Sequence, residues 1–375
     1  MKYSITKLTN TSNSNLNYVF KHYPDLLNKT IKDTYFIQLL YTIINKASLQ
    51  KTEHNCVVRN NVIPTINSNI FLPKEIHKYI NETKTILYDV ILTIKGIKFN
   101  IKIYSTEPIK IEKYIYFIKI ILNICVNESQ SESQSESHSK KGLSITLHLT
   151  PFKKVMPTKI ATPHHINSGF TEEDITIFRK EEWFKVLIHE CFHAFCLDFI
   201  DVNIDFKKLF NMYHIDSDFL FCESLVEFWA RTINIGIVSY YTKKNIDYEE
   251  FEMLMQVNIS IEQVYSILQM KHILHSFGVT YYDLLKGPSD YKENTNCFCY
   301  YVLSALLLSH YEQTMGWFIE HNDTLLQFNK NTQHIYMFYH YIKTIYNSPH
   351  FFKLIDEKKE FDLNNICMCV FEIDL

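Results

Sequence analysis

The sequence predicts an α+β fold in which a small, twisted, mainly antiparallel sheet lies between helical regions. Residues 83–150 contain β-rich, partly alternating segments, whereas apolar residues recur at helical spacing through most of residues 234–375. We therefore divide the chain into a helical N-terminal region (1–82), a part with the sheet and one long helix (83–200), and a helical C-terminal part (201–375). The length of 375 residues is ample for a large core.

In the N-terminal region, residues 16–27 and 34–47 have the apolar spacing of helices. Residues 48–73 are punctuated by Asn and Pro, so we expect irregular structure there. Nothing in this region suggests chemistry.

The sheet is predicted from residues 86–94 and 97–104, which Lys95 and Gly96 join as a β-hairpin. Residues 109–126 follow as a helix, and residues 143–149 read as a further strand. Between them, residues 127–142 are low-complexity Ser, Glu and Gln, which cannot bury apolar surface and are expected to form a disordered surface loop.

The next helix carries the main chemical motif. No Gly or Pro interrupts residues 180–199, and apolar residues recur there at helical spacing. Within this segment, His189, Glu190 and His193 form an H-E-x-x-H pattern. Residues four apart lie on one face of a helix, so His189 and His193 can direct a ring nitrogen at one metal ion. Imidazole suits zinc, and a catalytic zinc has three protein ligands and one open position.

A third ligand is expected on a second helix, predicted over residues 217–234 with Ser217 as its cap. Glu223 and Glu227 lie four apart on one face of this mostly apolar helix. Two carboxylates there are costly unless a cation compensates them. We therefore expect Glu223 to bind the metal and Glu227 to accept the outward N–H of a zinc-binding histidine.

These residues carry a family resemblance. H-E-C-F-H (189–193) followed about thirty residues later by E-S-L-V-E (223–227) resembles the gluzincin branch of the zincin metallopeptidases. The segment NSGFT (167–171), then EEWFKVLIHE and His193, is also similar to uncharacterised metallopeptidase-like proteins of large DNA viruses. The resemblance covers residues 143–234. It implies a zinc cofactor, Glu190 as general base and a helical C-terminal part that supplies the third metal ligand.

The resemblance further implies a substrate groove along the edge strand of the sheet, beside the metal helix. Residues Ile166, Asn167, Ser168 and Gly169 are the candidates, because an exposed edge can pair with an extended peptide. The chain lacks a clear match to the family's oxyanion-stabilising Tyr or His. Tyr213 and His214, in the connection between the two helices, are candidates, and Tyr240, Tyr241 and His310 are equally arguable.

Several other residues admit a functional and a structural interpretation. His164 and His165 could be metal ligands, although the His189, His193 and Glu223 set already fills a three-ligand site. Arg179 could hold a substrate carboxylate, but a structural ion pair is the preferred interpretation. Two C-x-C pairs could bind a structural zinc, but buried thiols are favoured: Cys297 with Cys299, and Cys367 with Cys369.

Net charge and cysteine content indicate which partners and which compartment to expect. The formal net charge is −3, which gives no electrostatic reason to expect nucleic acid or a membrane surface as a partner. The nine cysteines are scattered and residues 1–11 contain no apolar signal segment. We therefore expect reduced thiols in a cytoplasmic compartment, which for a viral protein means the host cytoplasm or the virion.

The sequence thus predicts a zinc-dependent metallopeptidase that acts on a polypeptide substrate. Two alternatives remain: a zinc hydrolase of a non-peptide amide or ester bond, and a catalytically silent zincin-fold structural or virion protein. Cleavage specificity, endo- or exopeptidase action and oligomeric state do not follow from the sequence.

Overall fold

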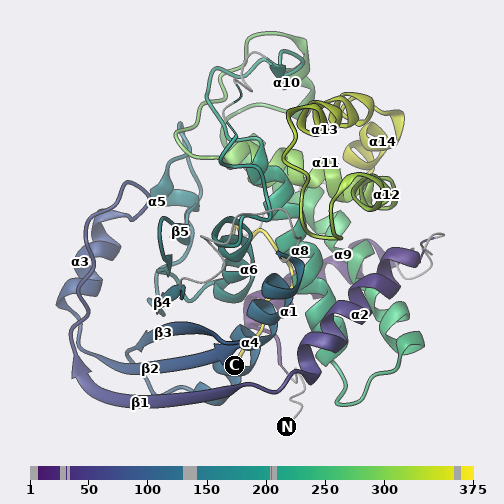
Figure 1. Cartoon of the computed structure of the whole chain (residues 1–375). Coiled ribbons are helices and arrows are strands. Elements are labelled where there is room, and N and C mark those ends of the chain that lie inside the picture. The colour runs from purple at the N-terminus through teal and green to yellow at the C-terminus, as the bar shows by residue number, and fades with distance from the viewer. Residues whose placement is uncertain are drawn as a thin grey trace.

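The computed structural model describes residues 7–25, 31, 34–129, 142–202, 204, 209–358 and 365–375. The predicted disordered loop lies mostly outside these residues. A six-stranded mixed sheet occupies one side of the molecule, and most of the helices gather on the other (Figure 1). The α+β class is therefore confirmed. Within the described part of the chain, no helix has the length and apolarity needed to cross a membrane.

The sheet has the strand order β1-β2-β3-β4-β6-β5. Neighbours β1–β2, β2–β3 and β6–β5 are antiparallel, whereas β3–β4 and β4–β6 are parallel. The sheet is thus larger and more mixed than the sequence predicted. The strand bounds are β1 Glu53–Val62, β2 Thr85–Ile94, β3 Ile97–Ser105, β4 Ser144–His148, β5 Gly169–Thr171 and β6 Ile175–Ile177.

The predicted hairpin is confirmed. Ile94 pairs with Ile97, and the two residues between them have positive φ, 47° at Lys95 and 81° at Gly96. Positive φ at both central residues is the geometry of a two-residue turn whose twist matches that of the strands. Along β2 and β3 the buried side chains alternate, as expected for a sheet with one face on the core.

Two strand predictions were wrong. Strand β1 lies where we expected irregular structure, because its residues are mostly exposed and carry almost no apolar alternation. The edge strand was expected at residues 166–169, but Ile166 belongs to the short helix α5 and strand β5 begins only at Gly169. Pro163 at the start of α5 favours this helical turn.

The helices before the metal motif are α1 Asn10–His22, α2 Tyr35–Leu49, α3 Lys74–Glu82, α4 Ile111–Glu128 and α5 Pro163–Ile166. The predicted helices near residues 16–27, 34–47 and 109–126 correspond to α1, α2 and α4. Helix α6 (Trp183–Ala194) carries the motif and packs between the sheet, α4 and α8 (Cys222–Tyr241). Its buried residues run almost continuously from Trp183 to Phe192, so both sides of the helix are covered.

The helical C-terminal part consists of α8, α9 (Tyr248–Ser276), α10 (Tyr281–Lys286), the π-helix η2 (Phe298–Leu303), and α11 to α14. Helix α8 starts five residues later than predicted and is wholly buried, and Ser217 does not cap it. Instead, the Ser217 hydroxyl accepts a hydrogen bond from the Glu293 amide. The remaining bounds are α11 Ser304–Ser309, α12 Tyr311–His321, α13 Thr332–Ile345 and α14 Pro349–Glu357.

Both ends of α6 have a non-glycine residue in the left-handed region, Glu182 with φ 55° and Cys196 with φ 52°. At the C-terminal end, the Cys196 amide donates to the His193 carbonyl and the Leu197 amide donates to the Phe192 carbonyl. This is the Schellman arrangement, in which glycine usually occupies the position of Cys196. The turn sends the chain back along the helix, which brings the next residues beside His193.

One hydrophobic core joins residues of the sheet, α6 and the C-terminal helices. Residues 366–371 are also buried and run beside α6, α8 and α9, where the Cys369 amide donates to Glu182 and the Val370 amide to Glu262. Helix α6 is therefore held by parts of the chain far apart in sequence.

Candidate metal centre

Three side chains from two packed helices converge on one point. His189 and His193 come from α6, and Glu223 comes from the first turn of α8. The Nε2 atoms of the two histidines are 3.3 Å apart, and Glu223 Oε2 lies 3.0 Å from His189 Nε2 and 3.4 Å from His193 Nε2. Within the described ranges, these residues form the one group of three or more His, Cys, Asp or Glu arranged to hold a metal.

The triangle of atoms fits a zinc ion. With bonds of about 2.0–2.1 Å, a tetrahedral site separates its ligand atoms by about 3.3–3.4 Å. The three observed distances, 3.0, 3.3 and 3.4 Å, are close to that spacing. Two imidazoles and one carboxylate are also the donor set of a catalytic rather than a structural zinc site, because three protein ligands leave one position open.

The outward nitrogen of each histidine faces a carboxylate. His193 Nδ1 is hydrogen-bonded to Asp198, and His189 Nδ1 lies 3.3 Å from Glu227 Oε2. A carboxylate on Nδ1 holds the proton there and leaves Nε2 with a free lone pair for a metal. Glu227 thus lies where the sequence predicted it. Asp198 was missed, although an acidic residue just after a metal-binding helix is a visible signal.

Glu227 has a cationic partner of its own. Lys185, one turn before His189 on α6, places Nζ 3.0 and 2.9 Å from the two carboxylate oxygens of Glu227. Both side chains are buried. Lys185 Nζ also lies 3.3 Å from the sulfur of Met368 in the C-terminal segment. A buried carboxylate without such a partner would be strongly destabilising, so Lys185 explains how Glu227 stays ionised beside His189.

The histidines and the carboxylates of the site shift each other's pKa values toward their charged forms. Burial acts to lower the pKa of His193, but the carboxylates of Asp198 and Glu223 outweigh it and raise that pKa well above its ordinary value. Burial acts to raise the pKa of Glu223, but the two histidines hold it well below its usual range. Without a metal, the site is therefore a cluster of histidine protons and carboxylates that a divalent cation can replace.

The other carboxylate oxygen of Glu223, Oε1, also has a hydrogen-bond partner. Asn296 donates from Nδ2 to Glu223 Oε1 over 3.1 Å. Asn296 lies two residues before the π-helix η2, in a part of the chain that the sequence did not connect with the site. Its hydrogen bond leaves Glu223 Oε2 as the oxygen that faces the two histidines.

The Glu190 carboxylate contacts the edge strand β5. Its Oε2 accepts a hydrogen bond from the Thr171 hydroxyl over 2.8 Å. A Cβ added at Gly169 would lie 3.1 Å from Glu190 Oε1 and 3.0 Å from Val186, so glycine makes room for this carboxylate. Burial raises the pKa of Glu190, while His189, His193 and the Thr171 hydroxyl act to lower it. A buried, raised-pKa carboxylate beside a metal site suits a general base.

Tyr300 is an aromatic residue that contacts the site. It lies on η2 with its ring 5.7 Å from the ring of His189. Burial raises its pKa well above the ordinary value, and the carboxylates of Glu223 and Glu190 act in the same direction. The Tyr300 hydroxyl therefore keeps its proton next to both carboxylates. Its position on a π-helix, an element common at functional sites, was hidden in an apolar stretch of sequence.

The predicted oxyanion candidates form hydrogen bonds with other residues. Tyr213 is buried against Phe298 with its hydroxyl 2.7 Å from that of Tyr281. His214 is exposed and contributes backbone hydrogen bonds to residues 284 and 289. The three alternatives bond to other partners: Tyr240 to Asn45, Tyr241 to Tyr116 and His310 to Ser348.

Most of the predicted groove residues are buried or hydrogen-bonded within the fold. Ile166 and Ser168 are buried, and the Asn167 carbonyl accepts a hydrogen bond from Arg179. The edge available for pairing is instead β5, Gly169–Thr171, whose one strand neighbour is β6. Arg179 forms no clamp for a substrate, because its guanidinium donates to the carbonyls of Asn167, Lys153 and His164.

The other candidate ligands stay outside the centre. His164 pairs with Glu75 over 2.6 Å, and His165 hydrogen-bonds to Thr162. The cysteines of the two C-x-C pairs are buried free thiols, as favoured from the sequence. Cys299 lies against the Leu220 carbonyl and Cys369 against Glu262, so the two pairs have different surroundings.

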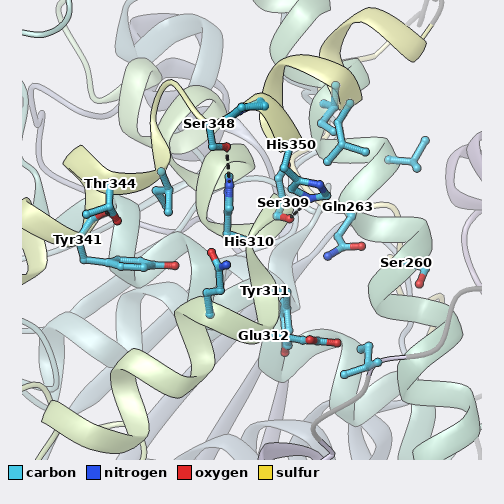
Figure 2. A pocket seen from close by; sticks show the side chains of 17 residues that line it. Ser260, Gln263, Ser309, His310, Tyr311, Glu312, Tyr341, Thr344, Ser348 and His350 are labelled. Carbon is cyan, nitrogen blue, oxygen red and sulfur yellow. Dashed lines mark hydrogen bonds between the residues drawn. The ribbon is translucent and has the colours of Figure 1, made fainter.

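A separate cavity of about 860 Å³ lies among α9, α11, α13 and α14 (Figure 2). His310 and Ser348 line this cavity and are hydrogen-bonded over 2.8 Å, and His350 lies nearby (Figure 2). Ser348 also caps α14 by accepting from the Phe351 amide. This contact ties α14 to the α11–α12 junction, which is a sufficient structural reason for the pair.

A scan against protein-family models, a search of curated proteins and a search of solved structures each gave no match for this chain. Its function is therefore inferred from the geometry of the site.

Proposed function

We propose that this protein is a zinc-dependent metallopeptidase of the zincin type. The observation that carries the proposal is the convergence of His189 Nε2, His193 Nε2 and Glu223 Oε2 within 3.4 Å of one another. Each histidine has its outward nitrogen beside a carboxylate, as zinc-binding histidines usually do. Glu190, the residue after the first ligand, adds a buried base.

The zinc ion would supply two effects, a lower pKa for a bound water and polarisation of the scissile carbonyl. The chain supplies the proton transfers. Glu190 accepts a proton from the attacking water and then donates it to the leaving amine. To reach that water, the Glu190 carboxylate exchanges or shares its hydrogen bond from Thr171.

Tyr300 takes the role for which Tyr213 and His214 were first considered. Its protonated hydroxyl lies near the carboxylates of Glu223 and Glu190. A hydroxyl there can donate a hydrogen bond to the oxyanion that forms on the substrate carbonyl. Replacing Tyr300 by Phe should lower kcat by about 10²-fold, as loss of one oxyanion donor does, and leave zinc content unchanged. Tyr213→Phe, which removes a distant buried hydroxyl, is the matched control.

An extended polypeptide is the substrate that the edge strand favours. β5 lies beside α6, and the side chain of Thr171 points at Glu190. A peptide added to the free edge of β5 would run past the general base and would be held by backbone hydrogen bonds. The groove is therefore proposed at Gly169–Thr171 rather than at residues 166–169.

The alternatives differ in their substrates. A zinc hydrolase of a non-peptide amide or ester would use the same ligands and the same Glu190, and a silent zincin-fold protein would bind zinc without turnover. The deciding experiment measures zinc content and the cleavage of a mixed peptide library by mass spectrometry, with an amide and ester library in parallel. We expect about one zinc per chain, peptide cleavage by the wild type, and zinc without cleavage in Glu190→Gln. A wild type without zinc, or a Glu190→Gln variant with wild-type rates, contradicts the proposal.

A further inference from the structure

Asn296 connects the third ligand to a distant part of the chain. Its Nδ2 donates to Glu223 Oε1 over 3.1 Å, and its Oδ1 accepts from the Leu220 amide over 2.9 Å. The orientation of the amide group is unambiguous, because a backbone N–H can only donate and a carboxylate oxygen can only accept. Asn296 thus holds both the ligand and the residue three positions before it, where the chain enters α8.

The two oxygens of Glu223 therefore have different surroundings. Oε2 lies within 3.4 Å of both histidine nitrogens, whereas Oε1 is directed at Asn296. The side chain of Glu223 is buried, so Oε1 has little access to water as an alternative partner. A buried carboxylate oxygen that loses its donor is strongly destabilised, and a nearby cation is then its best remaining partner.

We propose that Asn296 is a positioning residue that restricts Glu223 to a single metal-facing oxygen and so keeps a coordination position open for substrate. This inference rests on the proposed function, because it assigns a role toward the metal that the site would hold. Without the Asn296 donor, the Glu223 carboxylate would be free to direct both oxygens toward a bound metal, which would fill the open position.

The competing interpretation is that Asn296 merely fastens its loop to the start of α8 through Leu220. The two roles are separable by substitution. Asn296→Ala removes both hydrogen bonds, and with them the side-chain interaction between Asn296 and Tyr300. Asn296→Asp keeps an acceptor for the Leu220 amide but cannot donate to Glu223, and it sets a second carboxylate against Oε1. Thr295→Val is the matched control, since the Thr295 hydroxyl bonds to Asn167 and not to a ligand.

The experiment uses the full chain loaded with cobalt(II), whose visible bands are intense in four-coordinate sites and weaker in five-coordinate ones. We expect intense bands for the wild type and Thr295→Val, and a clear loss of intensity for both Asn296 variants. Zinc affinity, measured by competition with a chelator, should change by about 10-fold or more in Asn296→Asp, in the range typical of altered partners of metal ligands. Near-UV circular dichroism reports whether each variant is folded.

The outcomes are distinguishable. If the wild type binds neither cobalt nor zinc, the proposed function fails and this inference fails with it. Suppose instead that the wild type binds cobalt and that the folded Asn296→Asp variant keeps the wild-type spectrum and zinc affinity. Asn296 then only anchors its loop to the start of α8, and this inference alone is overturned. If Asn296→Ala does not fold, Asn296→Asp alone decides between the two roles, since it retains the Leu220 contact.

Discussion

The candidate metal centre and the cavity each contain a pair of histidines with nearly the same ring geometry. The rings of His189 and His193 are 5.0 Å apart at 75°, and those of His310 and His350 are 5.4 Å apart at 76°. Their surroundings differ. In the metal centre the Nδ1 atoms face Glu227 and Asp198, whereas His310 Nδ1 faces the Leu306 carbonyl and His350 Nε2 faces the Ser309 carbonyl.

The charge on the neighbouring groups decides the chemistry. The carboxylates of Asp198 and Glu223 raise the pKa of His193 well above its ordinary value, while burial lowers the pKa of His310. His310 is therefore a neutral ring whose Nε2 accepts from the Ser348 hydroxyl, and it serves packing. The comparison teaches that ring proximity is a weak sign of a metal site, and that carboxylates behind the rings are a strong one.

The largest expected difference between the two pairs is in metal content. His193→Ala should lose the zinc entirely, because it removes one of three ligands. His310→Ala should keep about one zinc per chain, since its ring faces Ser348 and Leu306. Metal analysis after dialysis measures both. Equal zinc loss in the two variants would remove the distinction drawn between the pairs.

The second largest effect on zinc binding is expected at the carboxylates that face the Nδ1 atoms of the two histidines. Asp198→Asn should weaken zinc binding by about 10–100-fold, since the Nδ1 proton of His193 then loses an ionised acceptor. Glu227→Gln should act similarly at His189, and combining it with Lys185→Met avoids leaving an unpaired buried lysine. Chelator competition gives the affinities. Glu312→Gln, at the cavity, is the control and should leave them unchanged.

The pH dependence of zinc binding follows from the raised histidine pKa values. Metal must displace protons from His189 and His193, so zinc affinity should increase as pH rises above 6.5 and level off above their folded pKa. In metal-free protein, the stability of the fold should change with pH in the opposite direction, falling as pH rises. Protonated histidines paired with carboxylates stabilise the fold below about pH 6.5, and that stability is lost as pH rises through their raised pKa. Thermal melts with and without zinc from pH 6 to 8.5 test both trends.

The smallest effect is expected at the cavity. Ser348→Ala removes the cap of α14 and the hydrogen bond to His310, and should lower the free energy of unfolding by about 1 kcal/mol. Zinc affinity should not change. Denaturant titration measures the first quantity and chelator competition the second. A drop in zinc affinity would mean that the two histidine pairs are coupled.

Local patterns in the sequence predicted much of the fold and half of the site. The hairpin at Lys95 and Gly96 follows from turn chemistry, and the alignment of His189 with His193 follows from helical spacing. Glu223 and Glu227 could be selected because two carboxylates on an apolar helix need compensation. All of these depend on residues within one or two turns of each other.

The remainder depends on contacts that no local pattern encodes. Asn296 reaches Glu223 from 73 positions away, and Tyr300 lies in a stretch that reads simply as a buried helix. Asp198 reaches His193 through the left-handed turn at Cys196, a position where sequence rules expect glycine. Strand β1 was missed because an exposed edge strand has little apolar alternation.

The left-handed residues at the two ends of α6 have a consequence for engineering heat tolerance. Such a conformation costs a non-glycine residue about 1 kcal/mol or more. At Glu182 the side chain also pairs with Lys154 and accepts from the Cys369 amide, so glycine there would forfeit more than it gains. Cys196 has no comparable side-chain role, and its backbone already forms the turn that glycine favours. Of the two ends of α6, Cys196 therefore carries the unused margin of thermal stability, three residues from His193.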